Sequence, residues 1–314
     1  MRFALMIEPQ MGLSYADQLA VARHAEDAGF EALFRSDHYE SFPGGSGRAT
    51  TDAWAVLAGL ARETSRIRLG PLVSPVAFRA PGNVAKLAAT VQEMSGGRLE
   101  LGLGAGWHED EHRRHGFDFP PIERRADMLE EQLAIVRGLL EGPDGWSFAG
   151  TAYSVQDAFF RPKPSPVPPI LVGGEGSPRS MRIAARFADE FNLSSSSPDR
   201  ARERFAMLDA ACVAAGRDPG TLHRSVMAGV LVGRDRATVE RRFGDLMRAI
   251  GSADDGDAWI ATRRPRWVFG TPDEAREMAR RFADAGAERL VLQDFIATDL
   301  AMIDELGEML VGSV

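Results

Sequence analysis

The sequence predicts an α/β protein folded as a (β/α)8 TIM barrel, and two observations carry this prediction. Eight short apolar runs of β-strand type alternate with amphipathic helical stretches along the 314 residues. Parallel strands need crossover helices between them, and a parallel sheet closes on itself at eight strands. We therefore expect one barrel domain over residues 1–314, with two insertions.

The expected strands recur at regular intervals, and a helical stretch follows each of them. In the first helical stretch, Leu19, Ala22, Ala25 and Ala28 repeat at helical spacing, and Gly29 suits the end of a helix. The expected strands are residues 3–8, 31–37, 66–74, 98–104, 168–174, 189–195, 223–233 and the end of 270–295. The helices between them are expected at residues 14–29, 53–63, 81–94, 123–140, 180–188, 199–216, 237–250 and the start of 270–295.

Two insertions break this rhythm. Residues 142–169 read as a short hairpin followed by a proline-rich extended segment that leads into the fifth strand. Residues 251–266 are polar and contain glycine, and they are a candidate for a mobile lid.

Composition and charge restrict the class of partner. Hydrophobic residues make up 44% of the chain and charged residues 26%, which is typical of a globular protein with a large core. The formal net charge of −8 argues against nucleic acid, because phosphate binding needs a basic surface. We find neither a signal peptide nor a membrane-spanning apolar run, and Cys212 is the only cysteine, so we expect a cytoplasmic protein that acts on a small molecule.

In a (β/α)8 barrel the loops after the carboxyl ends of the strands build the active site. That rule selects residues after six of the strands. They are Glu8, Ser36, Asp37, His38, Ser74, Pro75, Gly104, Gly106, Trp107, His108, Glu109, Gly173, Gly174, Glu175, Gly176, Ser177, Asn192 and Ser194 to Ser197.

His38 is the best candidate for proton transfer, because imidazole titrates near neutral pH. The alternative is a histidine that only holds its loop by a hydrogen bond. The neighbouring Asp37 either orients His38 or caps the next segment, and the sequence does not separate these two roles.

Two glycine turns are candidates for a cofactor pocket. In the segment 98–112, Gly104 and Gly106 end a strand and precede a helix, so they either form a pocket wall or only let the helix pack closely. In the segment 172–186, glycines and a serine stand directly before a helix, and their backbone N–H groups suit a phosphate. The alternative for this second turn is a backbone that needs positive φ angles. The serine-rich segment 194–200 offers a second contact for an anion.

A metal site is less well supported. His108, His112 and His115 follow one another at spacings of four and three, with Glu109 and Glu111 between them. We interpret this charged segment as a solvated helix face, and we expect no metal.

Five motifs in this order resemble the bacterial luciferase-like superfamily, and most closely its branch that uses the deazaflavin coenzyme F420. The motifs are FRSDHY, RIRLGPLVSPVAFRAPGNVAK, MSGGRLELGLGAGWHEDEHRRHGFDFPP, ILVGGEGSPRSMRIAARFADEFN and VFGTPDEAREMARRFADAGAERLVL. The resemblance implies an oxidoreductase with a luciferase-like TIM barrel that transfers a hydride between F420 and a small organic substrate. It also implies a homodimer.

The resemblance assigns roles to residues of this chain. It places His38 beside the ring, and Val73 and Ser74 in a bulge with Leu72 that supports the ring and often contains a non-prolyl cis peptide. The phosphate contacts that it implies are Gly173, Gly174, Gly176 and Ser177, with Ser194 and Ser195 opposite.

One departure concerns the substrate. Sugar-phosphate dehydrogenases of this family carry an acidic glutamate where this chain has Trp107, so oxidation of a sugar phosphate is disfavoured and Trp107, Glu8 and Glu109 are expected to shape another pocket. The alternative function is an FMN-dependent two-component monooxygenase, which receives reduced FMN from a separate reductase. A metal-dependent barrel hydrolase and a flavin-binding protein without catalysis are further alternatives.

Overall fold

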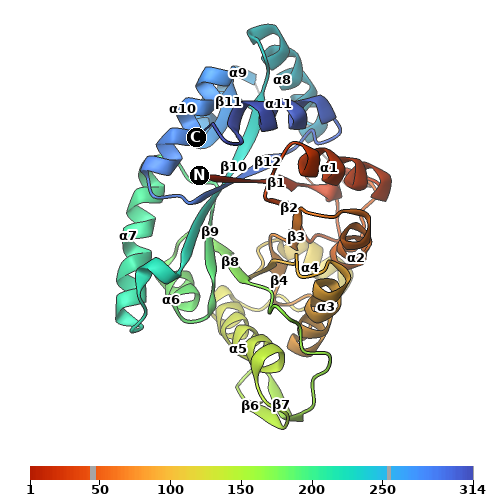
Figure 1. Cartoon of the computed structure of the whole chain (residues 1–314), viewed down its shortest axis with the longest axis vertical. Helices are drawn as coiled ribbons and strands as arrows, with labels where there is room; N and C mark the ends of the chain where they lie inside the picture. The colour runs from red at the N-terminus through yellow and green to blue at the C-terminus, as the bar shows by residue number, and fades with distance from the viewer. Residues whose placement is uncertain (43–46, 253–255, 314) are drawn as a thin grey trace.

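The computed structural model describes residues 1–42, 47–252 and 256–313. Its main sheet is parallel and runs around the centre of the molecule, with helices outside it (Figure 1). The strands of this sheet are β1 (Arg2–Ile7), β2 (Ala32–Arg35), β3 (Arg68–Pro71), β4 (Ser74–Pro75), β5 (Leu101–Gly104), β8 (Ile170–Gly174), β9 (Glu190–Ser194), β10 (His223–Val232), β11 (Trp267–Gly270) and β12 (Arg289–Asp294).

The strand order closes the sheet into a barrel. Neighbouring strands follow the order β3-β2-β1-β12-β10-β9-β8-β5-β4, while β11 pairs with the second half of β10. The barrel closes where Leu69 of β3, at one end of this path, pairs with Leu99, just before β5 near the other end. The predicted barrel is therefore confirmed.

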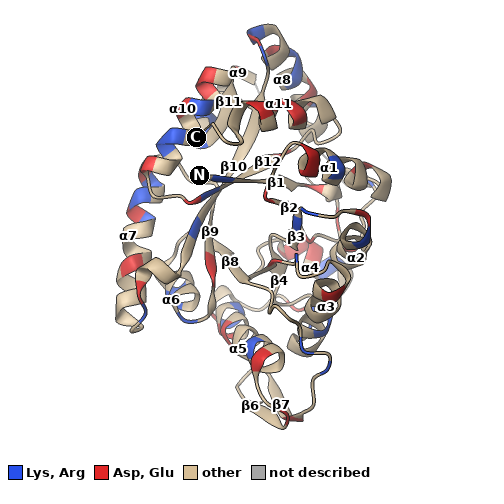
Figure 2. Ribbon diagram, viewed as in Figure 1, with Lys and Arg blue, Asp and Glu red and all other residues tan. Residues whose placement is uncertain are grey.

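The helices cover the outside of the barrel and carry most of the charged side chains (Figure 2). They are α1 (Tyr15–Asp27), α2 (Ala53–Glu63), α3 (Pro81–Met94), α4 (Glu109–His115), α5 (Ile122–Glu141), α6 (Pro178–Phe187), α7 (Pro198–Ala214), α8 (Arg236–Ile250), α9 (Gly256–Arg263), α10 (Pro272–Asp284) and α11 (Leu300–Leu310). Among these described helices, we find none with the length and apolar character needed to cross a membrane.

Alternation along the strands divides the core into two parts, because successive side chains of a strand point to opposite faces of the sheet. In β1, Phe3, Leu5 and Ile7 belong to the large cluster between the barrel and its helices, whereas Ala4 and Met6 belong to a second, smaller cluster. The smaller cluster fills the inside of the barrel with Ala32, Phe34, Leu72, Leu171 and Val291.

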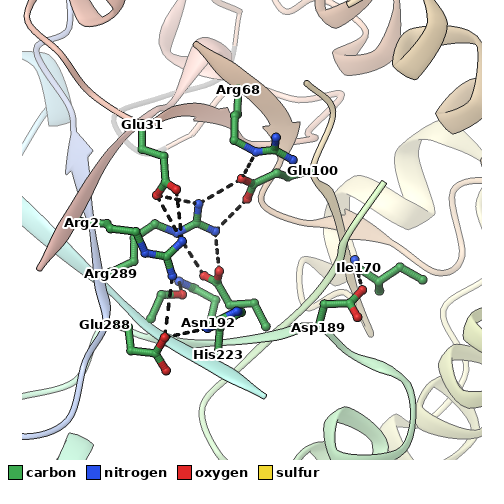
Figure 3. A network of polar contacts seen from close by, with 12 residues as sticks. Arg2, Glu31, Arg68, Glu100, Ile170, Asp189, Asn192, His223, Glu288 and Arg289 are labelled. Carbon is green, nitrogen blue, oxygen red and sulfur yellow. Dashed lines mark hydrogen bonds and ion pairs between the residues drawn. The ribbon is translucent and has the colours of Figure 1, made fainter. Parts of the chain in front are cut away.

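An ion cluster closes the barrel at the amino-terminal ends of the strands (Figure 3). Arg289 of β12 is 1% exposed and pairs with Glu100 at 2.7 Å and with Glu190 at 2.6 Å. Arg68 also pairs with Glu100, and the guanidinium of Arg289 lies 5.2 Å from the ring of Phe34 above it. The ion cluster and the apolar cluster thus fill the barrel interior at the amino-terminal ends of the strands. The open space lies at the carboxyl ends.

Several local features differ from the expected elements. The expected strand 66–74 is split into β3 and β4, and the peptide between Leu72 and Val73, which lie between these two strands, is cis. The strand β11, which precedes α10, and the helix α11, which follows the last strand, were not expected. Part of the polar stretch 251–266 forms α9, whose Trp259 is buried against Trp267.

The other insertion forms a hairpin. Strands β6 (Trp146–Ala149) and β7 (Ser154–Ala158) pair antiparallel and lie at the end of α5, away from the barrel (Figure 1). A segment with a cis proline at Pro162 and another at Pro166 then leads back to β8.

Candidate functional site

A cavity of about 770 Å³ lies at the carboxyl ends of the barrel strands. It has an apolar wall, a polar end at the turns after β8 and β9, and a mouth around His38. Its size is that of pockets that hold a cofactor or a small ligand.

The apolar wall is built around the interrupted strand between β3 and β4. Leu72 and Val73, joined by the cis peptide, line the cavity together with Met6, Met227 and Phe295. The resemblance implied such a bulge at this place. The side chains present a surface without hydrogen-bonding groups, which suits the face of an aromatic ring system.

Glycines behind this wall make room for Val73. A Cβ atom on Gly104 would lie 2.5 Å from Val73 Cγ2, and a Cβ atom on Gly173 would lie 2.8 Å from Val73 Cγ1. A Cβ atom on Gly102 would lie 2.0 Å from the carbonyl oxygen of Pro71. Gly104 and Gly173 line the cavity. The space that a side chain at either position would need is occupied by Val73 of the bulge.

The polar end consists of two turns that precede helices. Ser177 caps α6, where its hydroxyl accepts a hydrogen bond from the backbone N–H of Ser180 at 3.1 Å. The residues of this end that line the cavity are Gly174, Glu175, Ser177, Arg179, Ser180, Ser194 and Ser195. Hydroxyl groups and the positive end of the α6 dipole make this end suitable for a phosphate. Gly176 is not among the lining residues; it is buried, and its φ of +77° serves the turn.

His38 stands at the mouth and is held by Glu111. The Nδ1 atom of His38 lies 2.9 Å from Oε2 of Glu111, whose side chain is fully buried. The other oxygen, Oε1, accepts hydrogen bonds from the backbone N–H groups of Tyr39 and Glu40. Burial opposes ionisation of Glu111, yet the hydrogen bonds from His38 and this backbone hold its pKa below the ordinary value. The ionised carboxylate accepts, so Nδ1 of His38 carries a proton and donates it, and Nε2 is left for a ligand.

The expectations for Asp37 and Ser74 are corrected by their contacts. Neither residue is among those that line the cavity. Asp37 is buried, accepts a hydrogen bond from the hydroxyl of Ser74 at 2.6 Å and pairs with Arg79. Asp37 therefore neither orients His38 nor caps a helix; it ties the loop after β2 to the start of β4.

The charged segment after β5 is exposed for the most part, and the interpretation as a solvated face is wrong for two of its residues. Glu111 and His112 of α4 are buried, and the Nδ1–H of His112 donates to the carbonyl of His108 at 2.8 Å. Burial lowers the pKa of His112. Among the described residues, no group of His, Cys, Asp or Glu is placed to hold a metal ion.

The mouth is aromatic. The ring of His38 contacts Phe42 at 4.5 Å and Trp107 at 5.9 Å between centroids, and His108 packs against Phe42 at 4.6 Å. Trp107 lines the cavity, as expected from its position, whereas Glu109 is exposed and is not among the lining residues.

Glu8 lies deeper in the cavity, within a network of neutral polar side chains. Its carboxylate accepts hydrogen bonds from Nε2 of Gln10 at 2.6 Å and from Nε2 of Gln293. The hydroxyl of Ser36 donates to Oε1 of Gln10 at 2.5 Å. All four side chains line the cavity, and the hydrogen bonds fix their orientation.

Comparisons with known proteins show which family and which proteins this chain resembles. The model of the luciferase-like monooxygenase family matches residues 1–309. The F420-dependent glucose-6-phosphate dehydrogenase of Microbacterium testaceum is 30% identical over 289 residues, covering 86% of this chain and 84% of that protein. The F420-dependent hydroxymycolic acid dehydrogenase of Mycobacterium tuberculosis is 32% identical over 282 residues, covering 86% of this chain and 76% of that protein.

A solved structure shares the fold. The structure of an F420-dependent secondary alcohol dehydrogenase in complex with an F420-acetone adduct superposes with a TM-score of 0.83. The two proteins are 22% identical, and the match covers 98% of each chain.

Proposed function

The chain belongs to the luciferase-like monooxygenase family, and from this we propose that it is an oxidoreductase that transfers a hydride between coenzyme F420 and a small organic substrate. The relatives named as F420-dependent support the cofactor. One observation carries the proposal: a single cavity joins an apolar wall, a polar end before α6 and the His38–Glu111 pair.

The residues present fit a deazaflavin. Leu72 and Val73 would support one face of the ring, and Ser177 and Ser180 with the turn after β9 would hold the phosphate. When bound, F420 supplies or accepts the hydride at C5 of its ring.

His38 handles the proton that accompanies the hydride. In the direction of alcohol oxidation, the substrate carbon loses a hydride and its hydroxyl loses a proton to Nε2 of His38, which leaves a carbonyl group. The buried carboxylate of Glu111 stabilises the protonated imidazole and keeps its ring oriented toward the cavity. In the reverse direction, the same atom returns the proton to the oxygen.

Fluorescence titration of the purified protein with F420 and, separately, with FMN tests the cofactor. We expect saturable binding of F420 and anaerobic turnover with it. We also expect His38→Ala to retain F420 binding but to lose on the order of 10²- to 10⁴-fold in kcat, which is the usual contribution of a positioned acid or base. A protein that does not bind F420 contradicts the proposal, and unchanged turnover in His38→Ala contradicts the role of His38.

The second candidate is an FMN-dependent two-component monooxygenase, which the name of the matching family favours. The same wall and polar end would hold FMN, and a separate reductase would supply it in reduced form. Oxygen uptake with reduced FMN, in the absence of anaerobic turnover with F420, would identify this activity.

Two further proposals concern the setting of the enzyme. We propose a cytoplasmic enzyme, as expected from the sequence; the distribution of the protein between cell fractions tests it. We also propose a homodimer, on the basis of the family alone; the mass of the protein in solution tests it.

A further inference from the structure

His112 carries an unused hydrogen-bond acceptor beside the cavity. Its side chain is 1% exposed and is among the residues that line the cavity. Burial lowers its pKa, and Nδ1 carries the proton because it donates to the carbonyl of His108 at 2.8 Å. The other ring nitrogen, Nε2, is therefore an acceptor, and among the described residues it has no hydrogen-bond partner. A buried acceptor without a partner costs free energy, and a donor on a bound ligand would remove this cost.

The side chains around this imidazole offer Nε2 no donor. The rings of Phe78 and Phe119 each lie 4.7 Å from the imidazole, between centroids. A Cβ atom on Gly106 would lie 3.5 Å from Nε2 and 3.2 Å from Cβ of Pro75. Gly106 and Pro75 both line the cavity. The ring edge that carries Nε2 thus faces the cavity lining at the point where Gly106 has no side chain.

The position of His112 in the barrel indicates which part of a ligand it meets. Strand β5 lies between β4 and β8 in the sheet. Leu72 and Val73 of the apolar wall precede β4, the polar end follows β8, and Gly106 and His112 follow β5. A ligand that covers the wall and reaches the polar end therefore passes the segment after β5.

The proposed cofactor has a hydroxylated chain at this place. In F420, as in FMN, a ribityl chain with hydroxyl groups joins the ring to the phosphate. With the ring on the wall and the phosphate at the polar end, this chain lies along the segment after β5. A hydroxyl group donates readily to a neutral imidazole nitrogen. The neighbouring Glu111 is already engaged, because its carboxylate accepts from His38 and from the backbone.

We propose that His112 is a positioning residue for the cofactor, whose Nε2 accepts a hydrogen bond from a hydroxyl group of the ribityl chain. This inference rests on the proposed function. The hydrogen bond holds the chain between the wall and the polar end and so keeps the ring beside His38.

The test measures affinity by fluorescence titration with two deazaflavins that differ only in the chain. One carries the ribityl chain without a phosphate, and the other carries a methyl group in place of the chain. In His112→Asn the side-chain amide takes the place of Nδ1 and can still donate to His108, but no atom remains at the position of Nε2. This variant should lower the preference for the ribityl compound about fivefold, the usual size of one hydrogen bond, and leave the affinity for the methyl compound unchanged.

A second variant and a control complete the series. His112→Gln places an amide oxygen near the position of Nε2, so it should retain most of the preference for the ribityl compound. His115→Asn is the control, since His115 is exposed on the same helix and is not among the lining residues. Both affinities should stay unchanged in this control.

The outcomes separate the two proposals. If F420 binds but His112→Asn weakens both compounds equally or weakens neither, His112 only packs α4, and the inference is wrong while the proposed function stands. If the protein binds FMN but no deazaflavin, the proposed function is wrong. Riboflavin and lumiflavin, which differ by the same chain, then replace the two deazaflavins in the same test. A protein that binds none of these four compounds contradicts the inference.

Discussion

Glu111 and His38 are 73 residues apart in the sequence and form the central contact of the site. The rule that sites follow strand ends identifies His38 from the sequence. Glu111 was missed because it lies within a run of charged residues that resembles a solvated helix surface. In the structure this side chain points inward. Its carboxylate accepts hydrogen bonds from the backbone N–H groups of Tyr39 and Glu40 and from the imidazole of His38.

Replacing Glu111 tests this contact. Glu111→Gln removes the negative charge that stabilises the protonated imidazole, so kcat should fall at least tenfold, within the range of general acid and base effects. The loss should appear in kcat, while the dissociation constant for F420 is unchanged. Glu109→Gln is the control, since Glu109 is exposed on the same helix. An unchanged kcat in Glu111→Gln would show that Glu111 only supports the loop.

Asp294 makes the stability of the protein dependent on pH. Its side chain is completely buried, its Oδ1 accepts a hydrogen bond from the backbone N–H of Ile296 at 2.8 Å, and burial raises its pKa to about 7. The folded state therefore keeps a proton that the unfolded chain releases near pH 4. Stability from this group is complete below pH 4 and is lost as the pH rises to 7.

Denaturant unfolding at pH 5 and pH 8 measures this loss. Relative to Asp294→Asn, which does not titrate, the wild type should lose about 2 to 3 kcal/mol between these two values, from about two pH units at 1.4 kcal/mol each. The comparison uses the change between the two pH values, so any constant effect of the substitution cancels. An equal pH dependence in the two proteins would contradict the assignment.

At the scale of elements, the interrupted strand between β3 and β4 shapes the cavity wall. The order of strands and helices follows from hydrophobic periodicity, which depends on local sequence. The bulge depends on neighbours that are distant in the chain, because Gly104 and Gly173 leave the space that Val73 fills. The resemblance implied this bulge, whereas periodicity predicted an unbroken strand.

Strand β11 and helix α9 were missed for a related reason. Residues 267–270 are short, and the polar stretch before them carries no clear period. Their conformation is set by packing, in which Trp259 of α9 lies 5.3 Å from Trp267 and β11 pairs with the second half of β10.

Filling the space behind the bulge should displace the wall. Gly104→Ala places a Cβ atom 2.5 Å from Val73 Cγ2, and overpacking of this kind costs about 1 to 3 kcal/mol. We expect the affinity for F420 to fall about tenfold or more. Combined with Val73→Ala, the same substitution should have little further effect, which a double-mutant cycle measures.

Gly82→Ala provides the control for that series. Gly82 lies within α3 with no atom within 4 Å of an added Cβ, so alanine should leave F420 binding unchanged and increase stability slightly. Equal losses of affinity in Gly82→Ala and Gly104→Ala would contradict the role of the bulge.

At the scale of the whole molecule, the stability of the barrel depends on one residue, Arg289, of the ion cluster at the amino-terminal ends of the strands. Burial raises the pKa of Glu190, despite its pairing with Arg289. Glu100 is also buried, but the two arginines Arg289 and Arg68 lower its pKa. Arg289 is thus the cation that both carboxylates share.

Arg289→Met should destabilise the protein by about 3 to 5 kcal/mol, because it leaves Glu100 and Glu190 buried beside each other with fewer partners. Chemical unfolding at pH 7 measures the loss. Arg2→Met is the control: Arg2 pairs with Glu31 at the rim of the same cluster and its side chain is 40% exposed, so we expect a change below about 1 kcal/mol. Similar losses in both variants would contradict a special role for Arg289.

The filled interior at the amino-terminal ends of the strands also has a consequence for the order in which ligands bind. In the part of the barrel that the structure describes, the apolar interior and the ion cluster block access from the amino-terminal ends of the strands. The wall of Leu72 and Val73 is therefore reached through the mouth beside Trp107. A substrate bound at that mouth would cover the deazaflavin ring and prevent the cofactor from dissociating. Steady-state measurements should therefore show a compulsory order, in which the cofactor enters before the substrate and leaves after the product.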